Sequence, residues 1–244
     1  GSDILGYVNG SLAMTAPLTG LGLTGKITVT GSNDADTLTV DDSGGLLSGF
    51  GGIVFNAGGG ADQLILSGGT FATETYDVGT GVDTVVNSSG NAQVVTFTDI
   101  ESAQSSLTLD SLTVRGTSGN DTINYEQGAT SAYGKVTVVG NAPLEFTNAA
   151  AIVLNGAGGD DAVDLGNSST PTELEAITVS GNASLAPPDG ASLWLDASTL
   201  SLADGAAVTG LTDLSASQNN ATTSGSPTFN ANGLGGMGTI HFTG

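Results

Sequence analysis

Apolar and polar residues alternate along much of this chain in short runs that end at glycine. Residues 27–31, 112–116, 136–140 and 177–181 each begin with an aliphatic residue, Thr and Val, and each ends at Gly. A period of two that stops at glycine predicts half-buried β-strands followed by turns. No segment has the pattern of a confident helix, so the sequence predicts an all-β protein. The inward positions that the alternation predicts are Val29, Leu38, Val40, Val54, Leu64, Leu66, Val85, Val95, Phe97, Val114, Ile123, Val138, Leu154, Val163, Leu165 and Val179.

A second pattern recurs five times: glycine, a short polar turn, aspartate and then an apolar strand. Repetition at intervals of tens of residues is typical of stacked repeat architectures, in which each unit buries its apolar face against the next. The pattern therefore predicts a solenoid. Its copies are residues 31–38, 58–64, 79–85, 116–123 and 156–163.

The spacing of the strand-ending glycines predicts the length of one coil. Residues 140–144 and 181–185 resemble each other at an offset of 41, which is twice a unit of roughly 20. With one coil near Phe97 whose turn lacks glycine, the mean is about 21 residues per coil. Two or three short strands fit into such a coil, so the expected fold is a parallel β-helix, or β-solenoid.

A change of texture near residues 186–190, where two prolines precede Asp-Gly, predicts a domain boundary. We expect an N-terminal lead-in or cap at 1–20, a β-helical repeat domain at 21–188 and a separate C-terminal segment at 189–244. The last segment contains the single tryptophan of the chain, Trp194.

The charge is strongly one-sided. The sequence has 24 Asp plus Glu against Lys26, Arg115 and Lys135, for a formal net charge of -21. Such a charge repels nucleic acid and anionic lipid and attracts divalent cations, so nucleic acid is not an expected partner. The longest apolar run, 149–154, is too short to cross a bilayer, so no membrane insertion is expected.

The five turns resemble the calcium-binding repeats of RTX toxins and secreted bacterial proteins, which recur about every nine residues. In that family, turn carbonyls and Asp carboxylates of stacked turns enclose Ca2+, which takes six to eight oxygen ligands. The corresponding aspartates here are 26, 21, 38 and 40 residues apart, so a coil of about 21 residues stacks only Asp62 over Asp83 and implies isolated ion sites. The alternative is that these residues satisfy only the turn geometry. The ligands that the resemblance implies are Asp36, Asp62, Asp83, Asp121 and Asp161, with Asp34, Asn120 and Asp160 in support.

Two further resemblances concern longer stretches. Residues 20–185 resemble the β-helical repeats of very large bacterial surface and adhesin proteins, including the element at 95–101. Residues 193–197, 212–215, 219–222 and 233–242 resemble the opening of a laminin-G-like or concanavalin-A-like sandwich, and this segment is long enough for only a part of such a domain. These resemblances imply an extracellular protein at the bacterial cell surface. They also imply a partial sheet that another subunit could complete.

Three functions follow as hypotheses. The preferred one is a non-enzymatic structural segment of a surface protein, such as an adhesin stalk, surface layer or fibre, with self-association through open β-helix ends. The second is a glycan-binding module in which Trp194 contacts a sugar, although a Trp between two leucines is more often a core residue. The third is a β-helical polysaccharide-degrading enzyme that uses the acid pairs Asp41–Asp42 or Asp160–Asp161, although neighbours on a strand face opposite sides.

Overall fold

The computed structural model describes residues 3–8, 11–17, 25–47, 51–181, 183–185, 195, 197, 200–215, 217–231 and 239–242. The described residues form β-strands, turns and bridges without an α-helix, which confirms the all-β prediction. No helix among them is long and apolar enough to cross a membrane. The strands are β1 (Asp3–Val8), β2 (Ser11–Pro17), β3 (Ile27–Thr30), β4 (Thr37–Asp41), β5 (Ile53–Asn56), β6 (Gln63–Ser67), β7 (Thr70–Asp77), β8 (Val82–Val86), β9 (Ala92–Thr98), β10 (Ser102–Ser105), β11 (Thr108–Arg115), β12 (Thr122–Gln127), β13 (Gly134–Val138), β14 (Leu144–Phe146), β15 (Ala151–Asn155), β16 (Asp161–Asp164), β17 (Ala176–Ser180), β18 (Ala183–Leu185), β19 (Gly210–Leu211), β20 (Ala221–Thr222), β21 (Thr228–Asn230) and β22 (Thr239–His241).

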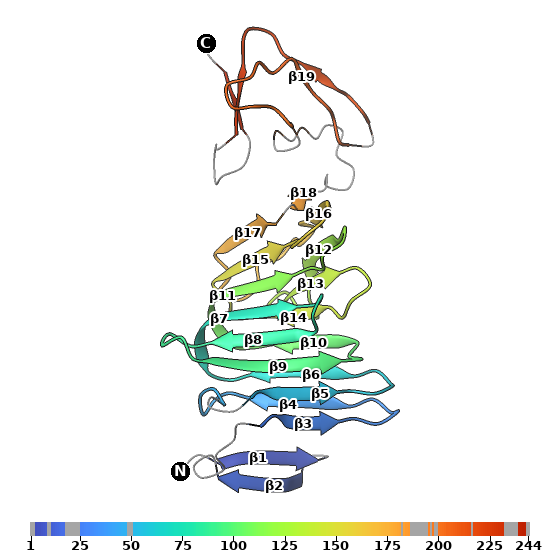
Figure 1. Ribbon diagram of the computed structural model, residues 1–244, viewed down its shortest axis with the longest axis vertical. Coiled ribbons are helices and arrows are strands. Elements are labelled where there is room, and N and C mark those ends of the chain that lie inside the picture. Colours follow the sequence, from blue (N-terminus) through green and yellow to red (C-terminus); the bar gives the residue numbers. More distant parts are fainter. Residues whose placement is uncertain are drawn as a thin grey trace.

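Strands β3 to β18 form two eight-stranded sheets, and the strands of each sheet follow one another along the long axis in Figure 1. Sheet 1 has the order β17-β15-β11-β7-β8-β9-β5-β3, and sheet 2 has the order β18-β16-β12-β13-β14-β10-β6-β4. The chain passes repeatedly from one sheet to the other, so β3, β5 and β9 in sheet 1 are followed by β4, β6 and β10 in sheet 2. Each passage turns a corner, and these corners contain most of the Gly-Asp turns found in the sequence.

Both sheets are mixed, whereas the sequence predicted parallel strands throughout. Strands β7–β8–β9 in sheet 1 and β12–β13–β14 in sheet 2 are antiparallel meanders, and the other pairs in the two sheets are parallel. Two of the glycine turns taken as ends of coils belong to these hairpins. Gly81, with φ of 64°, lies between β7 and β8, and Gly140, with φ of 91°, lies between β13 and β14. A positive φ suits a tight hairpin turn as well as a coil corner, so glycine alone does not distinguish the two.

An aromatic pair joins the first and third strands of each meander. Tyr76 of β7 stacks on Phe97 of β9 with ring centroids 5.3 Å apart, and Tyr125 of β12 stacks on Phe146 of β14 at 6.3 Å. All four side chains are buried. Such stacking adds to the burial of apolar area, so these pairs help to hold the meanders in the stack.

The spacing between paired residues differs from the predicted period of about 21. Thr37 pairs with Gln63 at a spacing of 26, and Asp161 pairs with Ala183 at 22. Where a meander intervenes, the spacing lengthens, as between Thr122 and Ala162 at 40. The 21-residue estimate therefore averaged turns between the two sheets with hairpin turns inside one sheet.

A single hydrophobic cluster contains side chains of both sheets, and eleven of the predicted core residues are buried in it. Val29, Leu38 and Val179 pack against it from the ends while partly exposed. Two predictions were wrong: Val54 lies on the outer side while Ile53 and Phe55 are buried, and Leu165 is exposed. The eleven buried residues are Val40, Leu64, Leu66, Val85, Val95, Phe97, Val114, Ile123, Val138, Leu154 and Val163.

Shorter pieces precede and follow the two large sheets. Strands β1 and β2 form an antiparallel pair, as do β19 with β20 and β21 with β22. Trp194 lies outside the described residues. The domain boundaries and the laminin-G-like character of the C-terminal segment stay predictions.

Candidate functional site

Four turns carry the chain from sheet 1 to sheet 2 through six residues that begin with Gly or Ala and end with Asp, and we call them the acidic corners: residues 31–36, 57–62, 116–121 and 156–161. In two of them the final aspartate closes its own turn. Asp121 Oδ2 accepts hydrogen bonds from the Thr117 amide at 2.7 Å and from Thr117 Oγ1 at 3.1 Å. Asp36 Oδ2 accepts in the same way from the amide of Ser32, at 2.6 Å. A carboxylate that accepts backbone N–H bonds stabilises the turn that presents them.

The carboxylates also connect one corner to the next. Asp62 Oδ1 accepts the amide of Asp36 at 2.7 Å, and Asp161 Oδ1 accepts the amide of Asp121 at 2.8 Å. The sequence analysis missed a further member of this series, Glu101, whose Oε2 accepts the amide of Asp62 at 2.6 Å. Its short corner has Asp99 at a φ of 58°, where the other corners have glycine, so no glycine motif marked it. The acids thus form two columns, Asp36–Asp62–Glu101 and Asp121–Asp161.

The supporting residues of the predicted ion sites lie on the outside of the same corners. Asn120 Oδ1 accepts the amide of Asp160 at 3.0 Å, which joins two corners 40 residues apart in sequence. Asp34 and Asp160 are exposed. Seven of the eight predicted ligands therefore belong to the corners, where most of them accept backbone amides within one turn or from a neighbouring corner.

Asp83 is the exception, because it lies in β8 and not in a corner. It is 1% exposed and faces the interior, opposite Val95 of β9 and Tyr76 of β7. The stacking of Asp62 over Asp83 expected from a 21-residue coil is therefore wrong, since Asp62 lies between Asp36 and Glu101. Asp83 therefore lies apart from the other predicted ion ligands.

Asp83 instead belongs to a buried acid cluster with Asp42 and Glu74. Asp42 Oδ2 accepts a hydrogen bond from Gln93 Nε2 at 3.0 Å, and Ser105 Oγ donates to Glu74 Oε2 at 2.5 Å. Glu74 and Asp83 influence each other's ionisation, so a proton on one of the two carboxyls avoids a pair of buried charges. The cluster connects the end of β4 to strands β7, β8, β9 and β10.

Burial changes the acidity of this cluster. Desolvation raises the pKa of Glu74 to about 7, against the hydrogen bond from Ser105, and raises the pKa of Asp42 to about 6, against the bond from Gln93. Burial and the neighbouring Glu74 raise the pKa of Asp83 well above its usual range. A carboxyl that is costly to ionise in the interior keeps its proton, so the cluster is partly neutral near pH 6.

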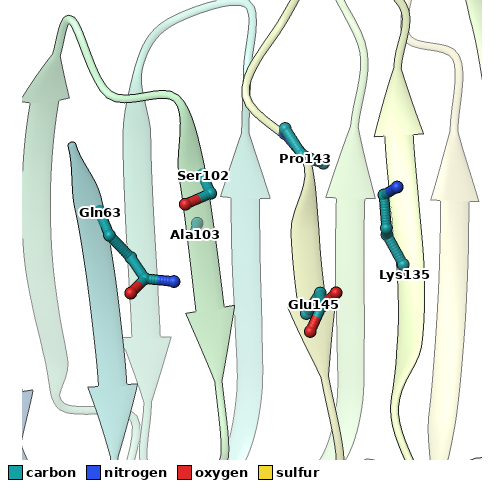
Figure 2. A pocket seen from close by; sticks show the side chains of 6 residues that line it. All are labelled: Gln63, Ser102, Ala103, Lys135, Pro143 and Glu145. Atoms are coloured by element: carbon teal, nitrogen blue, oxygen red, sulfur yellow. The ribbon is translucent and has the colours of Figure 1, made fainter. Parts of the chain in front are cut away.

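A shallow hollow of about 310 Å3 lies on the outer face of sheet 2. Figure 2 shows its side chains on four neighbouring strands. Lys135 and Glu145 are direct cross-strand neighbours, and Lys135 Nζ lies 3.7 Å from Glu126 Oε2. None of the lining residues is aromatic and one of them is a carboxylate, whereas ligand pockets are lined mainly by hydrophobic and aromatic side chains. The lining consists of Gln63, Ser102, Ala103, Lys135, Pro143 and Glu145.

Neither a metal-binding group nor a similar known protein identifies a function for these sites. Among the residues that the structure describes, no three Asp, Glu, His or Cys side chains form a group that could hold a metal ion. No protein-family model, curated protein or solved structure matches the chain. The class that the fold defines is an all-β protein of two mixed sheets joined by acidic corners.

Replacing Asp62 with Ala tests whether the corner acids have a structural role. The change removes the acceptor of the Asp36 amide at a side chain that is 1% exposed, so we expect a loss of about 1–2 kcal/mol in the free energy of unfolding. Urea denaturation without calcium measures it. Asp34→Ala, at an exposed acid of the neighbouring corner, is the control and is expected to have little effect. Equal stabilities of the two variants would contradict the structural role.

Proposed function

We propose that this chain is a non-enzymatic structural segment of a bacterial extracellular surface protein. In this proposal β3 to β18 act as a two-sheet β-helix, in which each winding passes once through each sheet and the meanders are insertions. The observation that carries the proposal is the pair of acid columns, because a side chain of one winding bonds the backbone of the next. Such bonds recur along one axis, as expected for a repeat structure that is stabilised by nearest neighbours.

The charge of the chain supports an exposed, extended role. Six of the 24 acidic residues lie in the acidic corners, and a net charge of -21 keeps a protein soluble and apart from nucleic acid and anionic lipid. A stalk or spacer needs length and resistance to unfolding more than a binding pocket, which agrees with the shallow, polar hollow on sheet 2.

Calcium binding at the corners is a separate part of the proposal. The ligands would be Asp36, Asp62, Asp121 and Asp161 with the exposed Asp34, Asn120 and Asp160, and the corner carbonyls would complete the oxygen shell. The hydrogen bonds of the corners already satisfy part of these carboxylates, so calcium would add to a structure that forms without it.

Small-angle X-ray scattering tests the structural role, with calcium and with a chelator as two arms. A compact globule of 244 residues has a radius of gyration of about 18 Å, and we expect a clearly larger value for an extended segment. A melting temperature that is higher with calcium than with the chelator supports the corner sites. A radius near 18 Å overturns the extended role, and identical melting curves overturn calcium binding without affecting that role.

A further inference from the structure

The two end strands of sheet 1 have nearly the same sequence. Residues 27–31, which contain β3, read Ile-Thr-Val-Thr-Gly, and residues 177–181, which contain β17, read Ile-Thr-Val-Ser-Gly. Each of these strands has a neighbour on one side within sheet 1, β5 for β3 and β15 for β17. Their inward side chains are therefore incompletely covered: Ile177 is 41% exposed, whereas its partner Ile152 is buried.

The two strands also run in the same direction. In sheet 1, β3, β5 and β9 are parallel, as are β7, β11, β15 and β17. Since β7 and β9 are both antiparallel to β8, the two groups run the same way. A strand β3 placed beside β17 without reversal would therefore continue the parallel pattern.

The free backbone groups of the two strands are complementary. Ile27 and Gly31 donate their amides to the carbonyls of Gly52 and Asn56, so in a parallel ladder the N–H and C=O of Thr28 and Thr30 point away from β5. The amide of Ala176 bonds to Ala150, so the polar groups of Ile177 and Val179 point away from β15.

We propose that β17 of one copy of this chain pairs in parallel with β3 of a second copy, with Ile177 opposite Ile27 and Val179 opposite Val29. In this register the Thr28 amide donates to the Ile177 carbonyl, as the Ile27 amide donates to the carbonyl of Gly52 within one copy. The inward column Ile152–Ile177 of one copy continues into Ile27–Ile53 of the next. The proposed partner is a second copy of the chain, and this inference rests on the proposed role as a structural segment.

Charge fixes the same register. Lys26 directly precedes β3 and is exposed, and it forms no salt bridge with any residue that the structure describes. Glu175 directly precedes β17 and is also exposed. With Ile177 opposite Ile27, Lys26 lies beside Ala176, and its long side chain reaches the adjacent Glu175 of the other copy. One of the three cations of a very acidic chain is thus placed at the contact that would otherwise bring acidic surfaces together.

The geometry of this contact determines the assembly. The two patches differ and lie at opposite ends of one sheet, so the contact is head-to-tail and adds copies in a row instead of closing a dimer. Every copy has a charge of -21, so the rows repel one another and their own ends at low salt. Assembly is therefore expected to rise with protein concentration and with salt.

A reciprocal charge exchange in the full chain tests the register. Sedimentation velocity of Lys26→Glu alone and of Glu175→Lys alone is expected to show assembly at concentrations about tenfold or more above that of the unchanged chain, because each variant sets like charges against each other. An equimolar mixture of the two variants is expected to restore assembly, since each contact then joins one acid and one base. A mixture that assembles no better than either variant would overturn the register.

A second pair of variants tests the apolar contact with matched surfaces. Ile177→Asp is expected to abolish assembly, while Val139→Asp, at an apolar side chain that is 57% exposed but lies away from both ends of sheet 1, is expected to leave it unchanged. Circular dichroism checks that both variants keep their strands. The interface is overturned if the unchanged chain stays monomeric at every protein concentration tested, in salt up to 0.5 M. That result is expected if the chain's own terminal segments cover the two edges. If its scattering is still extended, the structural role survives, and a compact monomer overturns both.

Discussion

Raising the pH from 5 to 8 is expected to lower the melting temperature of this protein by on the order of 10 °C. The cause is the buried acid cluster of Asp42, Glu74 and Asp83, whose pKa values are raised by burial, to about 7 in Glu74 and about 6 in Asp42. Unfolded Asp and Glu titrate near pH 4, so between about pH 4 and pH 7 the folded state binds more protons than the unfolded state. The free energy of unfolding therefore falls as the pH rises through this window, by on the order of 3 kcal/mol for Glu74 alone.

This fall in stability with rising pH is opposite to the effect of a carboxylate whose pKa is lowered in the folded state. Asp41 is such a case, since hydrogen bonds from Ser43 lower its pKa, and its contribution is lost only as the pH falls below about 4. Asp41 and Asp42 are adjacent in sequence but differ in exposure: the first is exposed and the second is buried. The interior cluster therefore dominates the change between pH 5 and pH 8.

Variants separate the cluster from the general repulsion of an acidic chain. The double variant Glu74→Gln with Asp83→Asn replaces both carboxyls with amides that do not titrate, and we expect its melting temperature to vary much less between pH 5 and pH 8. Asp110→Asn removes one exposed charge from β11 and is expected to keep the full dependence. Differential scanning calorimetry at a series of pH values measures both. The same steep decline in the double variant would show that the net charge, and not the cluster, sets the pH dependence.

The buried acid cluster could not be predicted from the sequence. In β7 the alternation changes phase between the buried Phe71 and the buried Glu74, so a strict period of two places one of them outside. The ladder with β11 is interrupted at the same place, since Leu109 pairs with Phe71 and Ser111 with Thr73 while Asp110 and Ala72 between them form no pair. No local pattern reports such an irregularity, and none reports that Gln93 and Ser105 come from distant strands to bond the acids.

Much of the sheet structure could be predicted from the sequence, because alternating apolar and polar residues indicate strands and glycines indicate turns. The sequence did not distinguish a corner from a hairpin, since Gly81 and Gly140 serve tight turns within a sheet. That distinction depends on whether the next strand returns to the same sheet, which is a long-range property. The corner acids were found because each aspartate follows a glycine by four or five residues, as Asp121 follows Gly116. Glu101 was missed because its corner is shorter.

The spacing of Gly116 and Asp121 leads to the second large effect. Gly116 is buried, and a Cβ added to it would lie 2.6 Å from Asp121 Oδ2 and 3.1 Å from the carbonyl oxygen of Gly156 in the next corner. The Asp121 carboxylate cannot move away without losing the hydrogen bonds that it accepts from the amide and hydroxyl of Thr117. The position therefore needs glycine for lack of space, and not for its backbone conformation.

Gly116→Ala is accordingly expected to lower the free energy of unfolding by about 3 kcal/mol, the upper part of the range for overpacking. Gly119→Ala in the same turn is the matched control, since its added Cβ would meet only Thr117 Oγ1, at an ordinary 3.6 Å. Because the control removes the same backbone freedom from the unfolded chain, the difference between the two variants isolates the crowding at the carboxylate. Combining Gly116→Ala with Asp121→Ala relieves the crowding but removes the turn's acceptor, so we expect the double variant to be less destabilised than the sum of the two single changes. Urea denaturation that finds strict additivity would place the cost of Gly116→Ala in the backbone instead of at Asp121.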